Sequence, residues 1–141
     1  KTKVMKKVIS LFASLSLVLF ITACSLTTAN IDDVKVCTSI TDNQCLADNS
    51  LFTTNTPEIY ISCHLNNAPE NTEVEFAWFY LGQEKMAIDA VKLSSGSNIG
   101  TLNLQSSLSK PTNGWPQGDY EVVVSIVGFD IDPIVKKFSV Q

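Results

Sequence analysis

The chain has 141 residues, of which 10 are lysine, 14 are acidic and none is arginine, for a net charge of −4 at pH 7. Four of the lysines fall within the first seven residues, so the rest of the chain carries six lysines against fourteen acidic residues, a net charge of −8. An acidic, arginine-free domain lacks the basic surface that nucleic-acid phosphates require, which excludes nucleic-acid binding as an expected function. It also lacks the basic patch that would hold a protein on anionic lipid.

The first segment has the pattern of an export signal. Lys6 and Lys7 precede an apolar run of fourteen uncharged residues, Val8 to Ile21. This run is short for a permanent membrane span, which needs about 20 apolar residues. A positive start, a short apolar run and small residues after it are typical of a signal peptide.

The stretch Ile21-Thr22-Ala23-Cys24 closes the apolar run and resembles the lipobox of bacterial lipoproteins. The resemblance implies that Cys24 is joined to a diacylglycerol and becomes the first residue of the mature chain. Several acyl chains at about 0.8 kcal/mol per buried CH₂ group would make the anchoring stable. Two other interpretations remain open: a plain secretory signal with a disulfide-forming Cys24, and an uncleaved anchor that carries a cysteine by chance.

These features divide the chain into three parts. We expect residues 1–23 to be a cleaved lipoprotein signal peptide, residues 24–33 to be a lipid-anchored tether, and residues 34–141 to be one β domain. The tether would reach about 30 Å when fully extended. Ser25 follows the anchor cysteine. It favours the outer membrane in a Gram-negative host, while a Gram-positive host would carry the protein on the outer face of its cell membrane.

The remainder repeats apolar alternation followed by a turn, which is the pattern of strands with one buried face. We expect strands at 34–39, 45–47, 58–66, 72–81, 86–93, 99–105, 119–127 and 134–140, with a long irregular loop at 106–117. Phe52, alone among polar residues, is expected to fill the core. Helix is confined to at most a turn near Leu104–Leu108. Seven or eight evenly spaced short strands predict an all-β antiparallel sandwich.

Three cysteines follow Cys24, namely Cys37, Cys45 and Cys63. Export places them in an oxidising compartment, and an odd number leaves one thiol free. Cys37 and Cys45 lie eight residues apart across a polar, turn-like run, so we predict that they form a disulfide. Cys63 alternates with apolar residues on one side of its strand, which predicts a buried and inert thiol.

Two details resemble an immunoglobulin-like sandwich. Gly118-Asp119-Tyr120-Glu121-Val122 resembles the start of strand F, where a tyrosine hydroxyl bonds back to the backbone. Cys63 and Trp78 are similar in placement to the cysteine and tryptophan of that fold. The second cysteine position is occupied by Val122, so an inter-sheet disulfide is excluded.

A wider resemblance covers most of the chain after Cys24. The residues that resemble a family of uncharacterised bacterial surface and envelope modules, often lipoproteins, are Phe52, Ile59-Tyr60, Asn67-Ala68-Pro69, Thr72, Phe76-Ala77-Trp78 and above all Gly114-Trp115-Pro116-Gln117-Gly118-Asp119-Tyr120-Glu121-Val122. The Gly-Trp-Pro-x-Gly-x-Tyr block is its specific part. The resemblance implies an extracytoplasmic location and no catalytic chemistry.

Few residues are candidates for chemistry. His64, the only histidine, faces away from Cys63 on its strand, which excludes a catalytic pair. Asp130 and Asp132 could bind calcium if Asp119 lies near them in space. Aspartate beside proline is also common in turns for local structural reasons. We therefore expect no metal and no cofactor, and we expect that the protein is not an enzyme.

The favoured hypothesis is a lipid-anchored binding or scaffold module of the bacterial cell envelope with an envelope protein as its partner. Trp115 and Pro116, in the loop before strand F, are the candidate contact residues, since an exposed tryptophan can grip a partner. Trp115 can instead fold back over the end of the sandwich. The alternative hypothesis is an inhibitor or protective protein that blocks an external enzyme by inserting the loop Lys110–Gly118.

Overall fold

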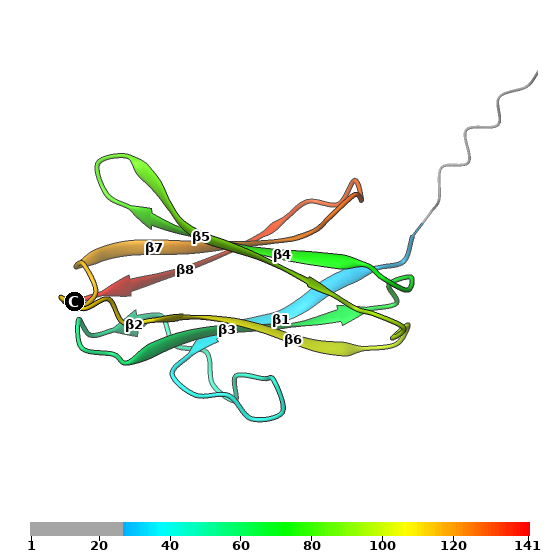
Figure 1. Ribbon diagram of the computed structural model, residues 1–141, viewed down its shortest axis with the longest axis horizontal. Coiled ribbons are helices and arrows are strands. Elements are labelled where there is room, and N and C mark those ends of the chain that lie inside the picture. Colours follow the sequence, from blue (N-terminus) through cyan, green and yellow to red (C-terminus); the bar gives the residue numbers. More distant parts are fainter. Residues whose placement is uncertain (1–26) are drawn as a thin grey trace, which may run out of the picture.

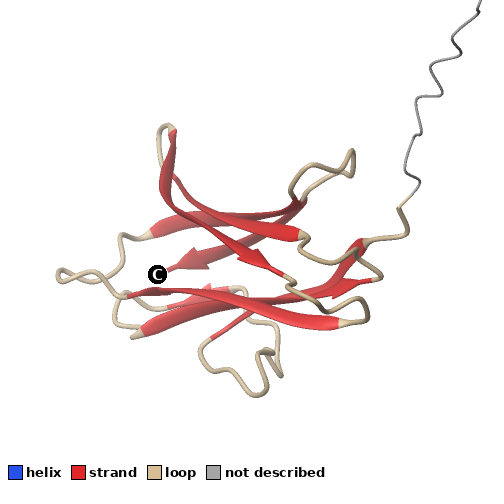
Figure 2. Cartoon of the chain, turned by 45° about the vertical axis from the view of Figure 1, so that its right-hand side comes forward, coloured by secondary structure: helices blue, strands red, loops and turns tan. Residues whose placement is uncertain are grey.

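The computed structural model describes residues 27–141, so Cys24, the signal segment and the first residues of the expected tether lie outside the described part. Residues 27–141 form eight strands and no helix (Figures 1 and 2). The strands are β1 (Asn30–Cys37), β2 (Leu51–Phe52), β3 (Glu58–Asn66), β4 (Glu73–Leu81), β5 (Lys85–Ser94), β6 (Leu102–Ser109), β7 (Gly118–Ile126) and β8 (Ile134–Val140). In this part of the chain we find no helix with the length and hydropathy needed to span a membrane.

The strands form two sheets that pack face to face (Figure 1). One sheet has the order β1-β3-β6 and the other the order β2-β8-β7-β4-β5. All neighbours are antiparallel except β2, which runs parallel to β8. The orders β1-β3-β6 and β8-β7-β4-β5 correspond to strands A-B-E and G-F-C-C′ of the immunoglobulin fold. The prediction of an all-β immunoglobulin-like sandwich is confirmed.

The core lies between the sheets and is built from alternate residues of each strand. The core-facing residues of β3, β4 and β7 are all buried or half-buried; they are Ile59, Ile61, Cys63, Leu65, Val74, Phe76, Trp78, Tyr80, Tyr120, Val122, Val124 and Ile126. Trp78 is 1% exposed, and its indole N–H donates to the Ser106 hydroxyl of the facing sheet at 3.2 Å. Phe52 is buried as expected and packs edge-on against Phe138 at 5.4 Å between ring centroids.

The predicted boundary between tether and domain was wrong. Strand β1 begins at Asn30, four residues earlier than expected, and Ala29 before it is already buried. The cause is a β-bulge between Asp32 and Lys35, where Asp33 takes a positive φ of 49°. A bulge adds one residue to one strand and so breaks the alternation that would have marked Ile31 as part of a strand.

Two further boundaries differ from prediction. Strand β6 continues to Ser109, so the stretch 104–108 is strand where a helical turn was allowed, and the irregular loop begins later than expected. The short strand expected at 45–47 is absent; the chain there follows a tight turn closed by paired backbone hydrogen bonds between Thr41 and Gln44.

The two ends of the sandwich carry different loops. At the near end, where β1 begins, lie the loops 67–72, 95–101 and 127–133. At the far end lie the loops 53–57, 82–84 and 110–117 together with the end of β8. The chain therefore joins the sandwich at one end, and the Gly-Trp-Pro-x-Gly-x-Tyr block lies at the other (Figure 1).

Candidate functional site

The loop that carries the Gly-Trp-Pro-x-Gly-x-Tyr block is held against the body of the domain. Lys110 N–H donates to the Pro57 carbonyl at 2.8 Å, and Trp115 N–H donates to the Thr54 carbonyl at 2.9 Å. Gly114 has a φ of 81°, and a Cβ at this position would lie 2.9 Å from the Thr54 carbonyl oxygen. Only glycine fits such a position without strain, which explains the first residue of the block.

Trp115 is buried, with 4% of its surface exposed. Its indole N–H donates to the Thr56 carbonyl at 2.7 Å, and its ring packs edge-on against Tyr120 at 6.0 Å between centroids. The hypothesis of an exposed Trp115 that grips a partner is therefore not supported, because the ring is folded over the end of the sandwich. Pro116 is exposed beside it. With the tryptophan turned inward, the loop Lys110–Gly118 offers no large apolar side chain for insertion into an enzyme.

Tyr120 forms the tyrosine corner that the sequence predicted. Its hydroxyl donates to the Pro116 carbonyl at 2.6 Å, four residues upstream. Its ring stacks on Phe138 with centroids 5.1 Å apart. Burial, together with the neighbouring Tyr80, raises the pKa of Tyr120 to about 12. The second glycine of the block, Gly118, has a φ of 137° and lies against the Tyr80 ring. The block therefore forms a rigid corner that these hydrogen bonds and ring contacts hold in place.

An apolar groove of about 180 Å³ opens beside this corner at the far end. Its lining consists of Tyr80, Met86, Ile88, Pro111, Trp115, Pro116 and Tyr120. The β4–β5 hairpin forms one wall because it curls away from the three-stranded sheet (upper left of Figure 1). Met86 and Ile88 consequently remain 62% and 42% exposed, although apolar side chains of this size are normally buried.

Met86 and Ile88 were not among the residues singled out from the sequence. The sequence does contain a sign of their position, because the alternation of apolar residues is interrupted within β5. Met86 and Ile88 are two residues apart, but Val91 comes three residues after Ile88. This shift is a β-bulge, seen as a change in register opposite Trp78 and Phe79. The bulge turns the hairpin outward and also blunts a free sheet edge.

The three cysteines in residues 27–141 are placed as predicted. Cys37 and Cys45 form a disulfide with their Cα atoms 5.7 Å apart. Cys63 is free and 1% exposed, and burial raises the pKa of its thiol to about 12. A thiol that stays protonated at neutral pH is a poor nucleophile.

His64 lies on the outer face of the three-stranded sheet, opposite to the buried Cys63 on the same strand. Its ring nitrogens lie 3.2 Å from a carboxylate oxygen of Asp32 and 3.7 Å from one of Asp33, and the Gln44 amide also contacts the ring. The residues between 27 and 141 hold no cluster of three or more His, Cys, Asp or Glu side chains able to share a metal ion.

The structure corrects the calcium hypothesis. Asp119 is the second residue of β7, whereas Asp130 and Asp132 follow the other end of that strand. The nine residues of β7 span about 30 Å, which places these carboxylates at opposite ends of the sandwich. Asp119 instead accepts a hydrogen bond from Ser139 at 2.6 Å.

Comparison with known proteins gives a likeness in fold alone. No family model and no curated protein sequence matches the chain. Among solved structures, it is similar to an alkylpurine DNA glycosylase AlkC of Pseudomonas fluorescens bound to DNA, with 15% identity, a TM-score of 0.48 and coverage of 82% of this chain. The matched part is 31% of the glycosylase, so the chain spans about a third of its length.

The chain is also similar to a Niemann-Pick type C2 protein from the Japanese carpenter ant. The identity is 10% and the TM-score 0.49, with 84% of this chain and 96% of the ant protein covered. At such identities and scores neither likeness supports an inference about function, which must come from the site itself.

Proposed function

We propose that the protein is a lipid-anchored, extracytoplasmic binding module of the bacterial cell envelope that holds a protein partner at its far end. The leader pattern and the lipobox-like Cys24 support the anchor, and Ser25 favours an outer-membrane location if the host is Gram-negative. The observation that carries the binding role is the apolar groove at the end of the sandwich opposite to the point where the chain enters β1.

The geometry of the anchor sets the orientation of the groove. Because β1 begins at Asn30, only Ser25 to Ala29 separate an acylated Cys24 from the sandwich, and five residues reach at most about 18 Å. The near end would therefore lie close to the membrane. The nine residues of β4 carry the groove about 30 Å further out. This orientation presents the groove to other envelope proteins.

The lining of the groove indicates which kind of partner side chain it binds. All seven residues that surround it offer ring or aliphatic surface, and its volume of about 180 Å³ suits one large apolar side chain. A single buried aromatic or aliphatic anchor of this kind often dominates the binding energy of an interface. Glu84 and Asp89 are exposed on the hairpin wall, and the domain is strongly acidic. We therefore expect the anchor side chain to be flanked by basic residues, which would also speed association.

The proposal does not include catalysis. Cys63 and His64 are adjacent in β3 and point to opposite faces, and the Cys63 thiol is buried with a raised pKa. Neither residue lies in the groove.

Site-specific photo-crosslinking in intact cells tests the proposal. A photoreactive phenylalanine analogue replaces Met86 in the groove wall, and the matched control carries it at Ile99, which is 66% exposed at the near end. We expect a covalent adduct with one envelope protein from position 86 but not from position 99. The adduct should disappear when Ile88→Glu places a charge in the groove. Equal labelling from both positions, or an adduct that survives Ile88→Glu, would refute the binding role of the groove.

A further inference from the structure

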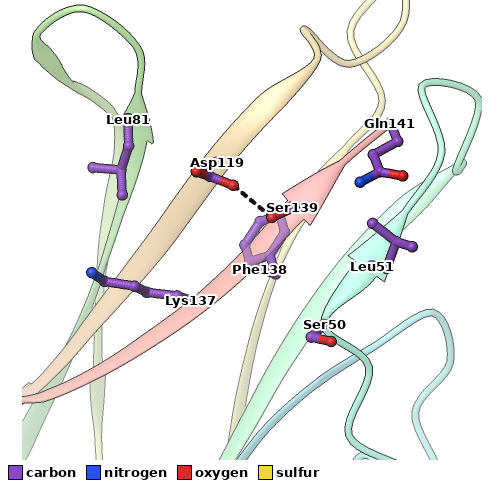
Figure 3. A pocket seen from close by; sticks show the side chains of 8 residues that line it. All are labelled: Ser50, Leu51, Leu81, Asp119, Lys137, Phe138, Ser139 and Gln141. Carbon is purple, nitrogen blue, oxygen red and sulfur yellow. Dashed lines mark hydrogen bonds between the residues drawn. The ribbon is translucent and has the colours of Figure 1, made fainter.

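A second concavity lies at the far end, on the outer face of the five-stranded sheet (Figure 3). It is an open hollow of about 510 Å³ between β2 and the β4–β5 hairpin. Its volume falls within the range of small-molecule sites, about 300–1,000 Å³. Unlike the groove, it is lined by both charged and apolar side chains: Ser50, Leu51, Leu81, Asp119, Lys137 and Gln141, with Ser139 and Phe138 beneath.

Asp119 supplies a fixed hydrogen-bond acceptor in the hollow. The Ser139 hydroxyl, on the neighbouring strand, donates to Asp119 Oδ1 at 2.6 Å (Figure 3). This bond orients the carboxylate but occupies one of about four acceptor positions on its two oxygens. Asp119 is exposed, so the remaining positions can accept hydrogen bonds from ligand hydroxyl groups.

Lys137 offers a positive charge that the carboxylate beside it does not neutralise, because that carboxylate is paired with another lysine. Its direct cross-strand neighbour on β7 is Glu121, but the Glu121 carboxylate is paired with Lys85 and is only 7% exposed. In residues 27–141, Lys137 has no acidic side chain within ion-pair distance. Its side chain lines the hollow instead (Figure 3).

Asp119 and Lys137 lie diagonally across β7 and β8, since Asp119 pairs with Ser139 and Glu121 with Lys137. Side chains on such a diagonal are separated by about 7 Å at their Cβ atoms. The two strands therefore present an acceptor for hydroxyl groups and a lysine side chain to the same hollow. Leu51, which is 56% exposed, and Leu81 flank them and offer apolar surface to the C–H face of a ring.

We propose that this hollow binds a sugar acid, with ring hydroxyls donating to Asp119 and the carboxylate paired with Lys137. The site uses no residue of the apolar groove and does not require lipidation of Cys24, so it stands apart from the proposed function. Ser50 and Gln141 at the rim provide further neutral hydrogen-bonding groups.

NMR titration of the full chain in detergent micelles tests this site. The probes are glucuronic acid and glucose, which differ only in a carboxylate in place of a hydroxymethyl group. We expect saturable shifts of the Asp119, Lys137 and Ser139 amide signals with glucuronic acid, and affinity for glucose at least about 10-fold weaker, because a charge-assisted contact is lost.

Three variants make the test specific. Lys137→Gln should weaken glucuronic acid binding about 10-fold and leave glucose unchanged, while Asp119→Asn should weaken both sugars. Lys92→Gln, an exposed lysine at the other end of the same sheet face, is the matched control and should change neither. All three positions are exposed, and the dispersion of each variant's spectrum verifies its fold. No saturable shift with glucuronic acid, equal affinity for the two sugars, or equal effects of Lys137→Gln and Lys92→Gln would overturn the proposal.

Discussion

Replacing Trp115 by phenylalanine separates a structural role of this residue from a binding role. The substitution keeps a buried ring but removes the indole N–H that donates to the Thr56 carbonyl at 2.7 Å. Thr56 is itself 8% exposed, so its carbonyl would lose a partner in a place that water reaches poorly. Removing one partner of a buried hydrogen bond costs about 1–3 kcal/mol. We therefore expect Trp115→Phe to lower the free energy of unfolding by about 2 kcal/mol.

The assay is urea unfolding followed by far-UV circular dichroism, in which a lower midpoint at constant slope reports a loss of stability. Met86→Ala is the control, because Met86 is 62% exposed and substitutions at exposed positions change stability by less than about 0.5 kcal/mol. A loss below about 0.5 kcal/mol in Trp115→Phe would show that the indole is not anchored. In that case the interpretation of the Gly-Trp-Pro-x-Gly-x-Tyr block as a rigid corner would be wrong.

Three other predictions concern the same domain. Gly114→Ala should destabilise it by about 1–3 kcal/mol in thermal unfolding, because the residue has a φ of 81° and a new Cβ would meet the Thr54 carbonyl; an unchanged melting temperature would contradict this. Replacing Cys37 and Cys45 together by alanine should cost at most about 2–3 kcal/mol in urea unfolding, since the closed loop is short, and a larger loss would mean that the disulfide orders more than its own loop. Burial raises the pKa of Tyr120 to about 12, so the neutral phenol stabilises the fold fully below about pH 10 and this stabilisation is lost as the pH rises toward 12. Between pH 10 and 12 the free energy of unfolding should thus fall less steeply in Tyr120→Phe than in the parent, and equal slopes would count against the assignment.

Much of the fold could be predicted because alternation is a local property of the sequence. The clean alternation over 58–66 predicted the buried side of β3, on which Cys63 lies, and the tyrosine corner at Tyr120 was expected from the resemblance of its segment to the start of strand F. The start of β1 was missed because a bulge at Asp33 shifts the pattern by one residue. Patterns of period two do not survive such an insertion.

The surface sites could not be predicted in the same way, because they depend on contacts between distant segments. The groove exists because the bulged β5 turns Met86 and Ile88 toward the loop of Trp115, more than 20 residues later. The hollow depends on the parallel pairing of the two-residue strand β2 with β8, which places Leu51 beside Ser139. Neither arrangement can be recognised from the composition of the nearby sequence. The sequence also allowed Trp115 to be interpreted as an exposed contact residue, because its hydrogen-bond partner, the Thr56 carbonyl, lies 59 residues away.

Attachment of the domain to a membrane through Cys24 can be measured by intact-mass spectrometry of the protein isolated from its native membrane fraction. We expect a chain that begins at Cys24 and is heavier than its sequence by a diacylglyceryl group and one amide-linked acyl chain. A Cys24→Ala variant should lack this added mass and leave the membrane fraction. An unmodified cysteine at position 24, or a mature chain that retains residues 1–23, would show that the domain is not anchored by lipid on Cys24.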